Sequence, residues 1–193
     1  MSELAINQTE QNLVNGIDVT KLFETLELVN SNKELAKFKF RNRNKWISGG
    51  HNRSTIQGFY GACQEDTSRE KPFIFDNDEP PVLLGENRGA NPVEYLLHAL
   101  AGCITTTFVV NAAAKGIRVN SMETSFEGDL NLLGFLGLPG RTKVGYEEIK
   151  VTVHVDSDAT VEQLNELVEM AERRSPVANT IKNPTPIKIK LEV

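Results

Sequence analysis

The chain has 193 residues, a net charge of -5 and 39% hydrophobic residues, enough for one large domain or two small ones with a proper core. The acidic balance, without any offsetting basic cluster, argues against a nucleic-acid-binding protein. Two cysteines are too few for a disulfide framework or a cysteine-based zinc site. The histidines (His51, His98 and His154) are dispersed and no glycine-rich turn joins a strand to a helix, so we expect neither a metal nor a cofactor.

The N-terminal residues 1–15 are polar and lack the apolar stretch of a signal peptide. No uninterrupted apolar run reaches the ~18 residues needed to span a bilayer. We therefore expect a cytoplasmic protein in a reducing compartment, without a membrane-spanning segment.

The first part of the chain is predicted to hold a short helix followed by strands. Asp18 or Thr20 can cap the helix. Residues 76–92 are rich in turn-forming types and are expected to cross the surface. Alternation of apolar and polar residues predicts strands at 36–47, 54–63 and 72–75, separated by a turn at 48–52 and a polar loop at 64–71.

The longest helical signal covers residues 91–115. Asn91 is a good N-cap, Pro92 suits the first helical position, and Glu94 can reach back to the cap amide. Gly116 suits the stop. Apolar residues lie all around this helix, which predicts a core element.

Cys103 lies in the middle of this helix. Free cysteine behaves as a small hydrophobe, so one interpretation is inert core filling, and the other is a sheltered nucleophile. His98 and Glu94 fall on other sides of the helix from Cys103. An activating cation or base must therefore come from another element or another subunit.

The order of predicted strands and helices along the whole chain is typical of an α+β protein rather than a doubly wound sheet. The loop at 132–145 mixes glycines with leucines and Phe135, so we expect it to be buried against another subunit or to cover an apolar pocket. This loop and the apolar helix together indicate an obligate oligomer. The remaining predictions are strands at 117–131, 146–155 and 186–193, a helix from Thr160, and a helical turn from Ser175.

These segments resemble the OsmC (osmotically inducible protein C) and organic hydroperoxide resistance family. Residues 92–103 are similar to its Asn-Pro-x-Glu…Ala-x-Cys helix, and Ser48-Gly49-Gly50 to the turn after its first strand. Residues 146–193 follow its closing order of strand, helix, Cys-Pro-x-x-Asn turn and strand. The resemblance covers an OsmC-like domain at 36–193 and leaves an N-terminal extension with a short helix at 1–35. It implies antiparallel sheets around a long central apolar helix, in an intertwined homodimer.

The resemblance also implies a mechanism. In the family, a helix cysteine attacks organic hydroperoxides, a second cysteine resolves the sulfenic acid, and an arginine–glutamate pair assists. Cys103 matches the attacking cysteine, whereas Ser175 stands at the resolving position and cannot form a disulfide. Read without the resemblance, Ser175 before Pro176 is simply a helix N-cap. Val93 stands where the assisting glutamate belongs, with Glu94 one place on.

His51 stands where the hydroperoxide-resistance branch has its arginine, and Arg53 follows two residues later. A peroxide-cleaving thiol must be a thiolate and needs a nearby cation, for which Arg53 is the best candidate. The alternative for Arg53 is a solvated charge at a strand end. Cys63 ends a predicted strand and is a candidate substitute for the resolving thiol; otherwise an external thiol is required.

The predicted function is that of an OsmC-like stress protein, a thiol-dependent peroxidase in which Cys103 attacks a small hydrophobic hydroperoxide. An external thiol reductant, or Cys63, would then resolve the product. The alternative is a non-catalytic OsmC-like homodimer that binds a small hydrophobic ligand at the subunit interface. The candidate site residues are Cys103 and Arg53 for catalysis, with Ser175, Cys63, Glu94 and His51 as resolving or pocket residues.

Overall fold

The computed structural model describes residues 12–140 and 142–192. All pairings between its strands are antiparallel, which confirms the α+β class. In chain order the elements are β1 (Leu13–Val14), β2 (Ile17–Asp18), α1 (Val19–Ser31), the 3-10 helix η1 (Lys33–Ala36), β3 (Arg43–Ser48), β4 (His51–Ile56), β5 (Phe59–Gly61), β6 (Gln64–Asp66), β7 (Phe73–Asn77), the 3-10 helix η2 (Pro81–Leu83), α2 (Pro92–Ala114), β8 (Val119–Leu130), α3 (Leu132–Phe135), β9 (Tyr146–Ser157), α4 (Val161–Arg174) and α5 (Pro176–Lys182).

The helices begin where local capping chemistry predicts. At α2, the Asn91 side chain accepts a hydrogen bond from the Val93 amide at 2.9 Å, and Glu94 accepts one from the Asn91 amide at 2.8 Å. Thr160 and Gln163 form a capping box of the same kind at α4, and the Asp18 side chain caps α1 by accepting a hydrogen bond from the Lys21 amide. Each cap satisfies amides that the first helical turn leaves unpaired.

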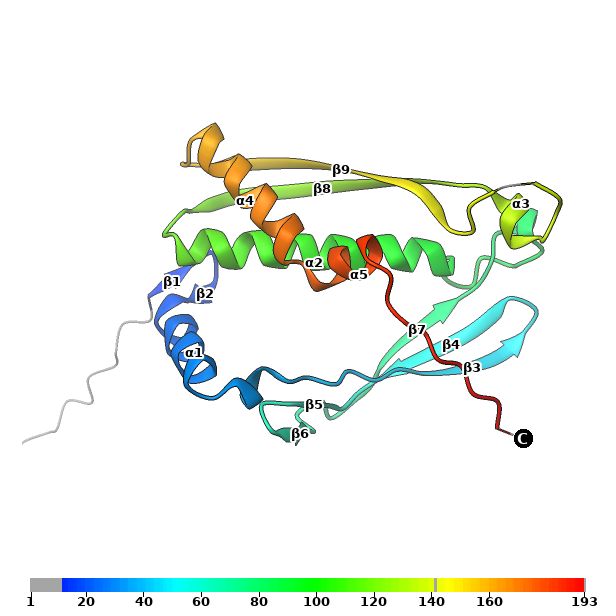
Figure 1. Cartoon of the computed structure of the whole chain (residues 1–193), viewed down its shortest axis with the longest axis horizontal. Coiled ribbons are helices and arrows are strands. Elements are labelled where there is room, and N and C mark those ends of the chain that lie inside the picture. Colours follow the sequence, from blue (N-terminus) through cyan, green and yellow to red (C-terminus); the bar gives the residue numbers. More distant parts are fainter. Residues whose placement is uncertain (1–11, 141, 193) are drawn as a thin grey trace, which may run out of the picture.

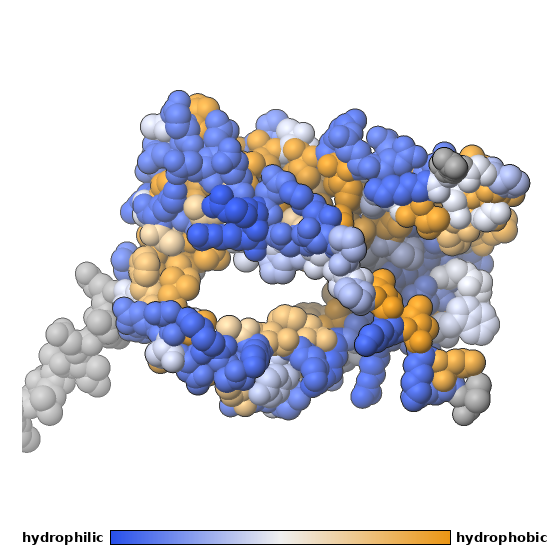
Figure 2. All heavy atoms as spheres, in the orientation of Figure 1, coloured by the Kyte–Doolittle hydropathy of each residue, from blue (hydrophilic) through white to orange (hydrophobic). Residues whose placement is uncertain are grey.

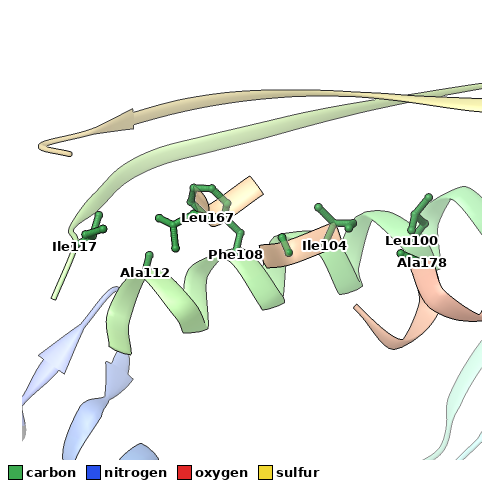
Figure 3. Packing of buried hydrophobic residues seen from close by; sticks show 8 residues of the cluster. Leu100, Ile104, Phe108, Ala112, Ile117, Leu167 and Ala178 are labelled. Carbon is green, nitrogen blue, oxygen red and sulfur yellow. The ribbon is translucent and has the colours of Figure 1, made fainter. Parts of the chain in front are cut away.

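The core lies where α2 is covered by the long β8–β9 ribbon and by α4 and α5 (Figure 1). Phe108 of α2 and Leu167 of α4 are its largest fully buried apolar side chains. Figure 3 shows Phe108 beside Leu167, and Leu100 of α2 beside Ala178 of α5. The buried cluster is Leu100, Ile104, Phe108, Ala112, Ile117, Leu167, Ala171 and Ala178.

By length and composition alone, α2 could cross a membrane, with a mean hydropathy of 1.5. One face of α2, however, carries Leu100, Ile104, Phe108 and Ala112 into the protein core. This packing is what a central core helix shows, and it explains the apolar composition.

A second lobe holds α1, η1 and the strands from β3 to β7, and Figure 2 shows an opening through the molecule between this lobe and the layer that contains α2. The exposed residues of α2 include the small residues Ala99, Gly102 and Thr106, beside the larger Leu96 and His98. A Cβ atom added to Gly102 would meet nothing within 4 Å. In the single chain α2 is therefore buried along its core face and at Ala113, but not around Gly102.

The strand predictions for residues 36–63 were wrong in their boundaries. The first of these strands begins only at Arg43, and the second divides into β4 and β5. The division occurs at Gln57 and Gly58; Ala62 and Cys63 then adopt left-handed backbone angles (φ 48° and 64°). This tight turn makes the polar residues of β6 the second strand of a hairpin, where a loop was predicted.

The closing strand predicted for residues 186–193 is not formed by residues 186–192, and Val193 lies outside the described residues. Ile187, Ile189 and Leu191 are all strongly exposed, Ile189 to 93%. A strand needs a neighbour to pair with, and no strand of the described chain accepts this tail. The apolar loop at 132–145 contains the short α3, and its Phe135 side chain is 75% exposed.

Candidate functional site

Cys103 is half-buried on α2, at the border between the core face and the exposed face. Its neighbours in sequence show the border: Ile104 belongs to the core, and Gly102 faces open space. Its backbone carbonyl accepts a hydrogen bond from Thr107 Oγ1 at 2.7 Å. Within residues 12–140 and 142–192, the Cys103 thiol has no hydrogen-bond partner.

Ser175 is completely buried at the junction of α4 and α5. Its Oγ accepts a hydrogen bond from the Ala178 amide at 3.1 Å, which caps α5. Ala178 packs in the core with Leu100 and Ile104, the residues on either side of Cys103 along α2. The structure therefore places the residue at the resolving position on an element that packs beside the α2 turn carrying Cys103.

Arg53 and His51 meet on one carboxylate, that of Asp76 in β7. Arg53 donates to Asp76 through Nε at 2.8 Å to Oδ1 and through Nη2 at 3.0 Å to Oδ2. His51 Nε2 lies 2.9 Å from Oδ1 of the same carboxylate. The hydrogen bonds from Arg53 and then His51 lower the pKa of Asp76 to about 2, so the carboxylate is charged at neutral pH.

His51 and Asp78 are both buried polar side chains. His51 is 8% exposed, and its Nδ1 atom has no partner among the described residues. Asp78 is 2% exposed and accepts hydrogen bonds from three backbone amides, those of Glu79, Glu86 and Arg88. These bonds lower the pKa of Asp78, the Arg88 amide having the largest effect. Asp78 thereby fixes the loop between β7 and α2.

Glu94 is exposed and serves the helix start, as its bond to the Asn91 amide shows. Val93 presents its carbonyl to the Tyr146 hydroxyl, which donates to it at 2.9 Å. Burial, and then the charge of Glu94, raise the pKa of Tyr146. Glu94 forms no ion pair with Arg53 in the part of the chain that the structure describes.

Cys63 is exposed on the left-handed turn between β5 and β6. Figure 1 shows this hairpin in the second lobe, apart from α2. The sheet that carries Arg53 also belongs to the second lobe. In the single chain Arg53 and His51 therefore lie together at Asp76, and Ser175 lies close to α2. Cys63 does not lie near Cys103.

A cavity of about 420 Å³ lies between α2, β9, α4 and α5. Leu100 and Ile104 form its α2 wall, and Val151, Val168 and Ile181 add further apolar surface. Lys182 and Glu172 stand at its edge and pair with each other. The cavity therefore offers an apolar space beside the helix turn that holds Cys103.

Sequence reasoning missed Asp76 and Asp78, which were placed in a surface-crossing segment. Asp76 lies directly opposite Arg53 in the antiparallel pairing of β4 with β7. The strand runs from Phe73 to Asn77, two residues beyond its predicted end at Phe75, and so includes Asp76. The pairing register itself cannot be read from one sequence.

The family model described as OsmC-like protein matches residues 85–190. The chain belongs to the OsmC-like protein family. The match begins after the sheet of β3, β4 and β7 and includes both Cys103 and Ser175. The boundary at residue 36 stays a prediction.

Relatives of the OsmC-like family support this assignment. A hydroperoxide reductase of Mycoplasma genitalium is 28% identical over 109 residues, which are 56% of this chain and 73% of the relative. An OsmC-like protein from Mycoplasma pneumoniae has a similar fold, with a TM-score of 0.56 and 19% identity over 76% of this chain and 89% of the other. An OsmC-like protein of unknown function from Vibrio cholerae gives a TM-score of 0.57 and 14% identity, covering 74% of this chain and 92% of the other. At such identities the solved structures show the fold alone.

Proposed function

We propose that this OsmC-like protein reduces organic hydroperoxides as a homodimer, with Cys103 as the only reacting thiol of each chain. The observation that carries the proposal is the position of Cys103. It is a half-buried thiol on the central helix of the fold, in the turn whose Leu100 and Ile104 line an apolar cavity, and the fully buried Ser175 hydroxyl caps the neighbouring α5. The likeness to the hydroperoxide reductase of Mycoplasma genitalium supports the reaction class.

The reaction divides into an oxidation and a reduction of Cys103. The thiolate sulfur attacks the terminal oxygen of the hydroperoxide; the S–O bond forms, the O–O bond breaks, and the departing alkoxide takes a proton to leave as an alcohol. Cys103 is then a sulfenic acid. An external thiol attacks its sulfur, releases water and forms a mixed disulfide, which a second external thiol cleaves to restore Cys103. This need for reduced thiols fits a cytoplasmic protein.

The homodimer is proposed because the single chain leaves small residues of α2 uncovered. The exposed side of α2 carries small side chains, those of Ala99, Gly102 and Thr106. A second helix can pack closely against such residues. Figure 2 shows that this layer borders the opening through the molecule. A second copy whose α2 enters the opening would carry its Cys103 towards the lobe with Arg53, which supplies the missing cation.

The test is consumption of tert-butyl hydroperoxide in the presence of a small dithiol, followed by mass spectrometry of the protein. We expect the wild type and Cys63→Ser to consume the hydroperoxide and to carry oxidised Cys103. Cys103→Ser should be inactive. Full activity in Cys103→Ser, or a Cys63–Cys103 disulfide as the main product, would reject the single-thiol mechanism.

The cavity also supports a second candidate, the binding of a small hydrophobic ligand without turnover. Its volume of about 420 Å³ suits a small ligand, and its walls are largely apolar. A fluorescent apolar probe that binds the wild type and Cys103→Ser equally, in a protein that consumes no hydroperoxide, would favour this function.

A further inference from the structure

The glutamate nearest to the assisting position is already engaged at the start of α2. Glu94 accepts a hydrogen bond from the Asn91 amide at 2.8 Å, completing the capping box. Val93 provides only its backbone carbonyl, which binds the Tyr146 hydroxyl. A guanidinium that must be oriented near the thiol therefore needs another carboxylate.

Asp76 has the geometry for that role. It faces Arg53 across the β4–β7 pairing, and its two oxygens hold the Nε and Nη2 groups of the guanidinium at 2.8 and 3.0 Å. Two parallel bonds of this kind fix the plane of a guanidinium as well as its position. Arg53 Nη1 has no hydrogen-bond partner in residues 12–140 and 142–192, so this edge of the guanidinium remains available to an anion.

Asp76 is in turn held in place by hydrogen-bonding groups other than Arg53. His51, which is 8% exposed, approaches Oδ1 to 2.9 Å. The Tyr95 hydroxyl donates to the Asp76 backbone carbonyl at 2.9 Å, and this bond ties β7 to the first turn of α2. A buried support of this type keeps a functional group in one orientation.

We propose that Asp76 is the positioning carboxylate of the hydroperoxide site: with His51 behind it, Asp76 aims Arg53 at the Cys103 of a second copy. The inference rests on the proposed function. Asp76 takes the place of the glutamate that the family carries on the helix, and it does so from a strand. Arg53 then stabilises the thiolate of Cys103 and the alkoxide that leaves the hydroperoxide.

The experiment uses full-length protein with Cys63→Ser, so that Cys103 is the only thiol. Its alkylation by iodoacetamide is followed against pH, beside the rate of its oxidation by tert-butyl hydroperoxide. Asp76→Asn should slow both reactions at neutral pH by about tenfold and move the alkylation profile to higher pH, because a misaligned guanidinium stabilises the thiolate less. Asp76→Glu, which keeps the carboxylate, should recover part of the loss.

Glu65→Gln is the matched control. Glu65 on the exposed β6 also holds an arginine through two hydrogen bonds, which Arg41 donates from Nη1 at 2.8 Å and from Nη2 at 2.7 Å. Its replacement should leave both profiles unchanged. Glu94→Gln tests the rival carboxylate, and a larger loss there than in Asp76→Asn would overturn the proposal.

If Asp76→Asn does not fold, Arg53→Lys tests the positioning role instead. Lysine keeps the positive charge but cannot make the two parallel hydrogen bonds of a guanidinium. It should shift the alkylation profile in the same direction, and an unchanged profile would reject the positioning role. The two proposals fail separately. A wild type that consumes no hydroperoxide overturns the function, whereas an Asp76→Asn variant with wild-type profiles overturns only the role of Asp76.

Discussion

Ser175 connects two helices at a point that solvent does not reach. Its hydroxyl accepts a hydrogen bond from the Ala178 amide, and its backbone carbonyl accepts one from the Asn179 side-chain amide at 2.8 Å. The same residue therefore serves the fold and, in the mechanism we propose, occupies the position where the resemblance implies a resolving thiol. A serine here keeps the helix cap and removes the disulfide chemistry.

Ser175→Cys should restore that chemistry. If the two Cα atoms lie within ~7 Å, hydroperoxide should produce a reducible disulfide with Cys103. The lost cap should cost about 1 kcal/mol of the free energy of unfolding. Thiol counting by mass spectrometry measures the bridge, and Ser175→Ala is the control for the cap. Three unbridged cysteines after oxidation would show that α5 does not present residue 175 to Cys103.

Asp76 should also make the stability of the protein depend on acid. Its pKa is lowered from 3.8 to about 2, so the folded state binds the proton less tightly than the unfolded chain. The resulting stabilisation is complete above the ordinary value of 3.8 and is lost as the pH falls through about 2. Urea unfolding should show a steeper acid loss for the wild type than for Asp76→Asn. Parallel curves would contradict the lowered pKa.

The site residues differ in how far the sequence could reveal them. Cys103, Ser175, His51 and Arg53 were proposed as site residues because each lies at a recognisable place in a local motif, and these roles stay predictions. Asp76 was missed because its role depends on which residue it faces across β4 and β7, and that register is a tertiary property.

At the scale of elements, α2 has one face in the core and one face of small residues. Gly102→Leu should leave the single chain folded, because a side chain at this position meets nothing within 4 Å. The same leucine should prevent close packing by a second α2, so the variant should sediment as a monomer. Glu169→Leu, at an exposed position of α4, is the control for added apolar surface. A dimeric Gly102→Leu would mean that α2 does not form the interface.

The β1–β2 hairpin is fastened to the core by one side chain. Asn15 donates to the Ile117 carbonyl at 2.9 Å and accepts from the Val119 amide at 2.9 Å. Its backbone is left-handed (φ 53°), so Asn15→Gly keeps the turn and removes only the side chain. We expect a loss of about 1–3 kcal/mol in urea denaturation. Asn87→Gly, also left-handed (φ 55°), is the control and should cost little.

The sequence predicted the ends of helices correctly where neighbouring residues determine them. The caps at Asp18, Asn91, Thr160 and Ser175 were predicted because a side chain and an amide two or three residues away decide them. Residues 186–192 were predicted as a strand from alternation alone, yet a strand also requires a neighbour. In the homodimer we propose, that neighbour would come from the second copy.

At the scale of the whole molecule, folding and association should be coupled. Trp46 and Phe40 are 69% and 70% exposed in the single chain, and such surface is costly to leave in water. The urea midpoint should therefore fall when the protein is diluted. Each tenfold dilution should lower the apparent free energy of unfolding of the dimer by about 1.4 kcal/mol. A midpoint that does not depend on concentration would indicate a self-sufficient monomer.

If a second copy fills the opening between the lobes, two inactive variants should restore each other's activity when they form mixed dimers. If each centre joins Cys103 of one chain to Arg53 of the other, Cys103→Ser and Arg53→Ala damage opposite halves of it. Unfolding the two variants together and refolding them should make mixed dimers, each with one complete centre and one doubly damaged centre. Random pairing would restore about a quarter of the wild-type rate from two inactive parents. A protein whose centres lie within single chains would show no such recovery.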